Sequence, residues 1–213
     1  MKGDTLRAMM FVDVLSHWCL AAIPAARALA DLTPNLEIVY APLAEGGAIG
    51  NTTEQEAWYY KRGAMAYGRE LRSDWCENPQ TRSWFANAIA YVGSQATGDA
   101  LRTAHAVMSA AMEQAQLFGR PNECYEFMGK YLDIPASEIG KRANEPQVKA
   151  ALDEGNRRLA ALGADERPTF LLENDIGDRV LLKGMWHKEL VAAAGLALLH
   201  DQRAYAMAGP PPF

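Results

Sequence analysis

The chain has 213 residues, of which 49% are hydrophobic and 22% are charged. This composition is typical of a folded globular protein and excludes a disordered or fibrous chain. The formal charge is -5, from 21 basic and 26 acidic side chains. We therefore expect neither a nucleic-acid partner nor binding to an anionic membrane, because both favour basic patches.

Three cysteines, Cys19, Cys76 and Cys124, are widely spaced along the chain. An odd number cannot form a complete disulfide framework, and no close cluster of cysteine and histidine predicts a metal site. The first residues lack the long apolar stretch of a secretory signal, and no apolar run is long enough to span a bilayer. We therefore expect a cytoplasmic protein that binds no metal.

Strand-like segments occur only near the two ends of the chain. Residues 8–15 and 36–43 carry β-branched and aromatic side chains at strand length. Between them, the Ala-rich residues 19–32 have apolar side chains at helical spacing. These three segments predict a βαβ unit with a right-handed crossover.

The middle of the chain, residues 52–162, has almost no strand pattern and is broken by Gly and Pro into helical segments. The predicted helices cover residues 53–72, 81–92, 99–117, 122–131, 136–141 and 146–162. This stretch is therefore expected to form an all-helical insertion.

A second strand-containing unit follows the helical stretch. Residues 169–173 and 179–182 flank a turn-forming sequence and predict a β-hairpin, which a helix over residues 187–203 follows. Because the strands at both ends must share one sheet, we expect a discontinuous α/β domain. Residues 1–51 and 164–213 form it, and the helical subdomain over residues 52–163 interrupts it.

Two short motifs carry a resemblance to a known family. The sequence Asp13-Val14-Leu15-Ser16-His17-Trp18-Cys19 follows the first strand and opens the first helix, and Arg167-Pro168-Thr169 precedes the third strand. Their order and spacing resemble the DsbA-like thioredoxin-fold family, closest to its branch of 2-hydroxychromene-2-carboxylate isomerase and kappa-class glutathione transferases. The resemblance implies an α/β, thioredoxin-like fold (βαβ…ββα) with a large all-helical insertion.

Ser16 stands where the redox members of this family have their nucleophilic cysteine. Disulfide exchange needs an attacking thiolate and a second thiol, and a serine cannot form a disulfide. In the isomerase and transferase branch a serine also occupies this place, and its hydroxyl lies near the sulfur of bound glutathione. The resemblance therefore implies glutathione as the cofactor and a catalytic role for Ser16. A serine here is also a preferred helix N-cap.

The other motif residues leave alternatives open. Cys19 is either a buried, unreactive thiol or a single reactive thiol that forms mixed disulfides. His17 either tunes a nearby thiolate and exchanges protons, or is an exposed loop side chain. Trp18 is expected to form a wall of the pocket or to pack in the core.

The second motif is expected to form the other half of the glutathione site. The resemblance implies that Pro168 follows a cis peptide bond and that Arg167 and Thr169 lie beside the ligand. A thiol peptide can then pair with the backbone of Arg167 in β fashion. The Arg167 guanidinium is expected either to meet a ligand carboxylate or to lie in solvent.

The leading interpretation is glutathione-linked isomerisation or transfer on a small molecule. Aromatic residues crowd the first part of the insertion and favour a flat aromatic substrate: Trp58, Tyr59, Tyr60, Trp75, Trp84 and Phe85. Two alternatives remain: a thiol–disulfide oxidoreductase that uses Cys19 alone or with Cys76, and a non-catalytic binding protein. The related isomerases and transferases also imply a homodimer.

Overall fold

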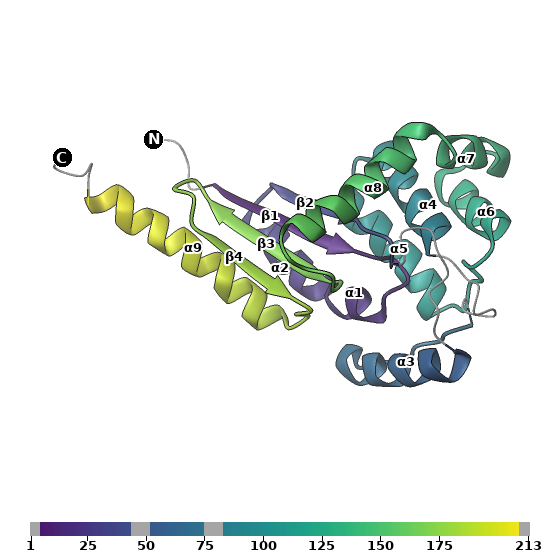
Figure 1. Ribbon diagram of the computed structural model, residues 1–213, viewed down its shortest axis with the longest axis horizontal. Coiled ribbons are helices and arrows are strands. Elements are labelled where there is room, and N and C mark those ends of the chain that lie inside the picture. Colours follow the sequence, from purple (N-terminus) through teal and green to yellow (C-terminus); the bar gives the residue numbers. More distant parts are fainter. Residues whose placement is uncertain (1–4, 44–51, 75–82, 209–213) are drawn as a thin grey trace.

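The structure is a computed structural model that describes residues 5–43, 52–74 and 83–208 of the chain. Within these residues, four strands form one sheet in the order β2-β1-β3-β4. The strands are β1 (Leu6–Val12), β2 (Leu36–Tyr40), β3 (Thr169–Asn174) and β4 (Arg179–Lys183). β1 is parallel to β2 and antiparallel to β3, which pairs antiparallel with β4. The strands from the two ends of the chain therefore share one sheet, as predicted (Figure 1).

The first two strands are shorter than predicted. β1 ends at Val12 and β2 ends at Tyr40, so residues 13–16 and 41–43 lie outside the ladder. The reason is the Asp13 side chain, whose two carboxylate oxygens accept hydrogen bonds from the backbone N–H groups of Leu15 and Leu43. These bonds replace strand pairing with a pair of adjoining loops.

The helix predicted over residues 19–32 is interrupted. It consists of α1 (His17–Ala21) and α2 (Ile23–Leu32), which meet at Ala22. Pro24 lies in the first turn of α2 and has no backbone N–H, so it cannot continue the hydrogen bonding of α1.

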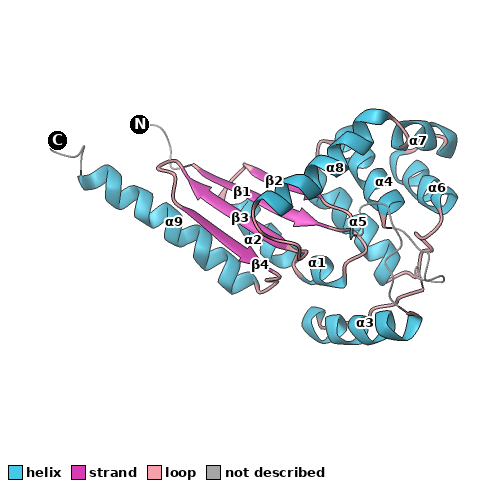
Figure 2. Ribbon diagram, viewed as in Figure 1, coloured by secondary structure: helices cyan, strands magenta, loops and turns pink. Residues whose placement is uncertain are grey.

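Helices occupy the described part of the segment between β2 and β3, and they gather at one end of the sheet (Figure 2). They are α3 (Thr53–Tyr67), α4 (Trp84–Thr97), α5 (Ala100–Met112), α6 (Pro121–Leu132), α7 (Ala136–Ala143) and α8 (Pro146–Ala161). α3 is shorter than predicted because Gly68 takes the left-handed conformation (φ 76°) and ends it. None of the helices in the described ranges is long and apolar enough to cross a membrane.

Different helices cover the two faces of the sheet. On one face, Met10 belongs to the same apolar core as Leu29 of α2 and Leu199 of the last helix, α9 (Lys188–Ala208). On the other face, Phe11 packs in a smaller cluster with Leu159 of α8. The sheet is therefore the middle layer, and α8 returns the chain from the insertion to β3.

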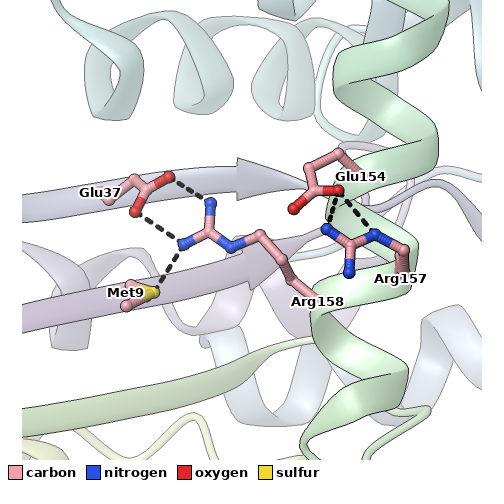
Figure 3. Close-up of polar contacts among 5 residues, drawn as sticks. All are labelled: Met9, Glu37, Glu154, Arg157 and Arg158. Atoms are coloured by element: carbon pink, nitrogen blue, oxygen red, sulfur yellow. Dashed lines mark hydrogen bonds and ion pairs between the residues drawn. The ribbon is translucent and has the colours of Figure 1, made fainter.

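α8 is fixed to the edge of the sheet by one arginine and one glycine. The Arg158 guanidinium donates to both carboxylate oxygens of Glu37 on β2 (2.6 and 2.9 Å) and to the sulfur of Met9 on β1 (2.8 Å), as Figure 3 shows. One turn earlier, a Cβ atom on Gly155 would lie 2.0 Å from the carbonyl oxygen of Tyr40. Only glycine allows this approach.

We predict that Gly155→Ala destabilises the protein by about 1–3 kcal/mol, because backbone must move to admit the methyl group. The free energy of unfolding, measured in urea, tests this. Gly195→Ala in α9 is the matched control, since the atoms nearest its added methyl are the ends of leucine side chains at 3.2–3.3 Å. We expect the control to change stability by less than about 1 kcal/mol. Equal effects at the two positions would contradict the prediction.

Candidate functional site

The first part of the site is the loop between β1 and α1. The Asp13 carboxylate is fully buried and accepts from the N–H groups of Leu15 (2.8 Å) and Leu43 (2.6 Å). The N–H of Ser16 donates to the Asp13 carbonyl (3.0 Å). This turn leaves Ser16 as the N-cap of α1, where its hydroxyl oxygen accepts from the N–H of Cys19 (3.4 Å).

The second part is the loop before β3, where the Arg167–Pro168 peptide bond is cis. The Ser16 hydroxyl donates to the carbonyl oxygen of Arg167 across 3.5 Å, so residues from the two ends of the chain meet. Thr169 is fully buried, and its hydroxyl donates to the Glu166 carbonyl (2.8 Å), which fixes the loop from inside. The structure thus brings Ser16, Arg167, Pro168 and Thr169 together.

The Arg167 guanidinium does not lie free in solvent, as one of the two alternatives had it. Its Nε donates to the Ala41 carbonyl (2.7 Å), and its two terminal nitrogens donate to the Asp165 carbonyl (2.6 Å) and to Oδ1 of Asn156 (2.5 Å). A longer bond of 3.4 Å reaches the Pro42 carbonyl. The guanidinium is thus bound to the protein itself, and the backbone of Arg167 is the part that faces Ser16.

Cys19 lies under the site with no exposed surface. Burial raises the pKa of its thiol to about 12. Because the thiolate is the reactive form of cysteine, burial disfavours the reactive form of this residue. Cys124 is also buried, donates to the Phe118 carbonyl (3.4 Å), and has a raised pKa for the same reason. Cys76 lies outside the described residues.

His17 is buried, and the alternative of an exposed loop side chain is wrong. Its ring lies 5.1 Å from the rings of Trp18 and Tyr60, and α3 covers it. A Cβ atom on Gly63 of α3 would lie 2.3 Å from Cδ2 of His17, so the helix can approach only because residue 63 is glycine. Among the described residues, Nε2 of His17 has no hydrogen-bond partner.

The environment of His17 favours its neutral form. Burial, and then the positive charge of Arg62, lower the pKa of the imidazole from 6.5 to about 4. His17 is therefore uncharged at neutral pH, and it presents a neutral ring beside Ser16.

An aromatic wall stands beside this ring. Trp18 stacks on Trp186 with 5.9 Å between ring centroids, and Trp186 stacks on His187 at 3.9 Å. The Arg62 guanidinium lies over Trp18, 5.0 Å from the ring centroid, as in a cation–π contact. Trp18 thus forms a wall with Trp186, a residue that lies near the other end of the chain.

Sequence reasoning missed three contributions from the helical insertion. The Tyr60 hydroxyl donates to the Leu15 carbonyl (2.7 Å), and Oδ1 of Asn87 accepts from the N–H of Val14 (3.2 Å), so α3 and α4 both hold the loop that carries Ser16. Arg62 is the third. No local pattern marks these residues, because their role depends on how the insertion packs against α1.

The aromatic residues expected to line a pocket do not line the cavity found along β2, and one of them, Trp75, lies outside the described residues. A cavity of about 840 Å³ lies along β2, α4 and α8, and its aromatic lining residues are Tyr40 and Tyr91. Trp58 and Tyr59 are instead 59% and 38% exposed on α3, and Tyr60 is in the core. None of the residues of the Ser16 site lines this cavity. Within the described ranges, no group of three or more His, Cys, Asp or Glu could hold a metal ion.

We predict that His17 makes the stability of the protein depend on pH. Because the folded-state pKa is depressed to about 4, the neutral ring stabilises the fold fully above pH 6.5, and this contribution is lost as the pH falls towards 4. Between about pH 7 and about pH 5, the wild type should lose about 2 kcal/mol more unfolding free energy than His17→Phe. Denaturant unfolding over this range tests it, and parallel curves would exclude His17 as the titrating group.

Comparison with known proteins rests on structure. No protein-family model matches the sequence, and no curated protein matches it. The cytosolic disulfide reductase DsbM from Pseudomonas aeruginosa is similar with 18% identity and a TM-score of 0.69, over 93% of this chain and 100% of DsbM. A structure of the same reductase with GSH has 17% identity and a TM-score of 0.68, over 93% and 100% of the two chains.

A second kind of enzyme and a further disulfide-handling protein are also similar in structure. 2-Hydroxychromene-2-carboxylate isomerase has 17% identity and a TM-score of 0.64, over 95% of this chain and 99% of the isomerase. DsbA from Pseudomonas aeruginosa has 13% identity and a TM-score of 0.59, over 96% of this chain and 90% of that chain. These similarities agree with the sheet order and the helical insertion described above. The chain therefore has the DsbA-like thioredoxin fold.

Proposed function

We propose that this protein is an enzyme that carries out glutathione-linked chemistry on a small molecule, as an isomerase or a transferase. The observation that carries the proposal is the pairing of the Ser16 hydroxyl with the loop of cis-Pro168, while the thiol of Cys19 is buried beneath it. Among the described residues, the site offers a hydroxyl and no reactive thiol. In the proposed function, a second molecule therefore supplies the thiol.

The residues present fit a thiol peptide such as glutathione. The Ser16 hydroxyl is a donor that can turn from the Arg167 carbonyl, since that bond is long at 3.5 Å. A hydroxyl that donates to a thiolate lowers the pKa of the thiol, because it stabilises the charged form. The backbone beside Pro168 can pair with the peptide part of the ligand in β fashion.

When bound, glutathione supplies a nucleophilic sulfur for addition to an electrophilic carbon. Ser16 would hold that sulfur by donating a hydrogen bond to it. The Trp18–Trp186 pair offers a flat apolar surface for an aromatic substrate, and Arg62 brings a positive charge to the same surface. The neutral His17 ring closes the site on the side of α3 and adds no second charge.

The structural neighbours support this proposal in two ways. One is an isomerase of the chemical type proposed, and another has been solved with GSH. DsbM is a cytosolic protein, which supports a cytoplasmic location here. An oxidoreductase function is less well supported, because the raised pKa of Cys19 leaves its thiol uncharged.

We predict that the protein binds glutathione and that Ser16→Ala weakens binding of the thiolate by about tenfold, the effect of losing one hydrogen bond to a charged group. Calorimetric titration of both proteins with reduced glutathione tests this. Cys19→Ala is the control and should bind with unchanged affinity, because Cys19 is buried.

Two outcomes would contradict the proposed function. Absence of binding at millimolar glutathione would favour a non-catalytic binding protein. Reduction of a disulfide substrate by the wild type, with loss of that activity in Cys19→Ala, would favour the oxidoreductase.

A further inference from the structure

Both loops of the site are hydrogen-bonded to one short segment, residues 41–43, which we call the exit segment because it leaves β2. From the first loop, the Asp13 carboxylate accepts from the N–H of Leu43 (2.6 Å). From the second loop, the Arg167 guanidinium donates to the carbonyls of Ala41 (2.7 Å) and Pro42 (3.4 Å). The exit segment thus lies between the anchors of Ser16 and Pro168.

The exit segment is itself held in place on its other sides. The N–H of Ala41, the first residue after β2, donates to the Val12 carbonyl at the end of β1 (2.8 Å). The Ser83 hydroxyl donates to the Leu43 carbonyl (3.2 Å), and Asn87 connects Ser83 back to the first loop. Nδ2 of Asn87 donates to the Ser83 carbonyl (2.9 Å), and Oδ1 of Asn87 accepts from the N–H of Val14.

These bonds close a ring that runs from Asp13 through Leu43, Ser83 and Asn87 to Val14, the neighbour of Asp13. Asp13, Ser83 and Asn87 have no exposed surface. A buried carboxylate is tolerated only where donors satisfy it, so the two backbone N–H groups fix its position closely. On the other side of the exit segment, Arg167 is fixed by its further bonds to Asp165 and Asn156.

We propose that Asp13 and Arg167 are positioning residues that set the place of the Ser16 side chain relative to the loop of Pro168 through the exit segment. The Asp13 carboxylate holds the loop of Ser16 against the exit segment. The Arg167 guanidinium holds the loop of Pro168 against the same segment. The alternative is that these bonds only stabilise the fold. The inference concerns the site of the proposed function, but its first test does not require glutathione.

The first test uses a thiol at position 16 as a local reporter. In Ser16→Cys, kept reduced with a phosphine, the introduced sulfur takes the place of the hydroxyl beside the N–H of Cys19. Its pKa, measured by thiolate absorbance, reports that position. Cys19 and Cys124 have raised pKa values and stay protonated, and Cys76 is replaced by serine in every protein.

Three charge-conserving substitutions are compared in this background. Arg167→Lys keeps the charge but removes the three donor nitrogens of the guanidinium. Asp13→Glu keeps the charge but moves the carboxylate by one methylene group. Arg158→Lys is the matched control, because Arg158 also joins α8 to the sheet and none of its bonds reaches the exit segment (Figure 3). Thermal unfolding of all proteins measures the loss of stability separately.

We expect Arg167→Lys and Asp13→Glu to raise the measured pKa of the reporter thiol by about 1 pH unit or more, because its thiolate moves away from its donors. Arg158→Lys should lower the unfolding temperature and leave the reporter pKa unchanged. An unchanged reporter pKa in Arg167→Lys, or an equal shift in Arg158→Lys, would overturn the proposal. If Asp13→Glu does not fold, Arg167→Lys decides the question.

The second test returns to Ser16 and measures glutathione affinity in the same three variants. We expect about tenfold weaker binding in Arg167→Lys and Asp13→Glu, and unchanged binding in Arg158→Lys. If the parent protein binds no glutathione, the proposed function fails while the reporter thiol still tests the positioning. If the parent binds and the reporter pKa does not respond, the positioning role fails and the proposed function stands.

Discussion

The antiparallel pairing of β1 with β3 is the constraint on which the site depends. Phe11 lies opposite Thr169, so the end of β1 and the beginning of β3 reach the same edge of the sheet. The loop that carries Ser16 and the loop that carries Pro168 must then lie side by side, although the whole insertion separates them in the chain. The insertion also holds the first of these loops, through Tyr60 of α3 and Asn87 of α4, and α8 must deliver the chain to β3 in register. The contacts of Arg158 and Gly155 with the first two strands serve that purpose.

The chemistry of the site follows from a difference in burial between Ser16 and Cys19, which belong to the same helical turn. Ser16 lies at the start of α1, where its hydroxyl reaches the opposite loop, and Cys19 lies one turn further in, under the surface. Burial raises the pKa of Cys19 and so disfavours its thiolate, the form that acts as a nucleophile. The serine is also buried, but its hydroxyl reaches the Arg167 carbonyl of the opposite loop, and a serine is a poor nucleophile without a base. This arrangement is the basis for proposing that an external thiol is used here.

The shared sheet and the helical insertion could be predicted from the sequence, because strand patterns and turn signals are local, and the resemblance to a known family implied that Ser16 and Pro168 belong to one site. The break at Ala22 and the early end of β1 were not foreseen. The break at Ala22 follows from Pro24, which does not disturb the helical spacing of the apolar residues and so left no sign in the pattern. The early end of β1 follows from the Asp13 side chain, which competes with the strand for backbone N–H groups. The roles of Arg167 and His17 depend on which segments pack beside them, and a single sequence does not contain that information. Whether Trp18 would face a pocket or the core depended likewise on Trp186, far away in the chain.

The close contact between Gly63 and His17 couples the sizes of two residues that belong to different parts of the molecule. A bulkier residue at position 63 would require a smaller one at position 17, and a proline at position 17 would leave a gap under α3. In this chain, the second residue of the motif is therefore not free to change independently of α3. We expect a substitution at position 17 to require a compensating substitution at position 63. A different motif introduced into this chain should therefore need a matching change at position 63 as well.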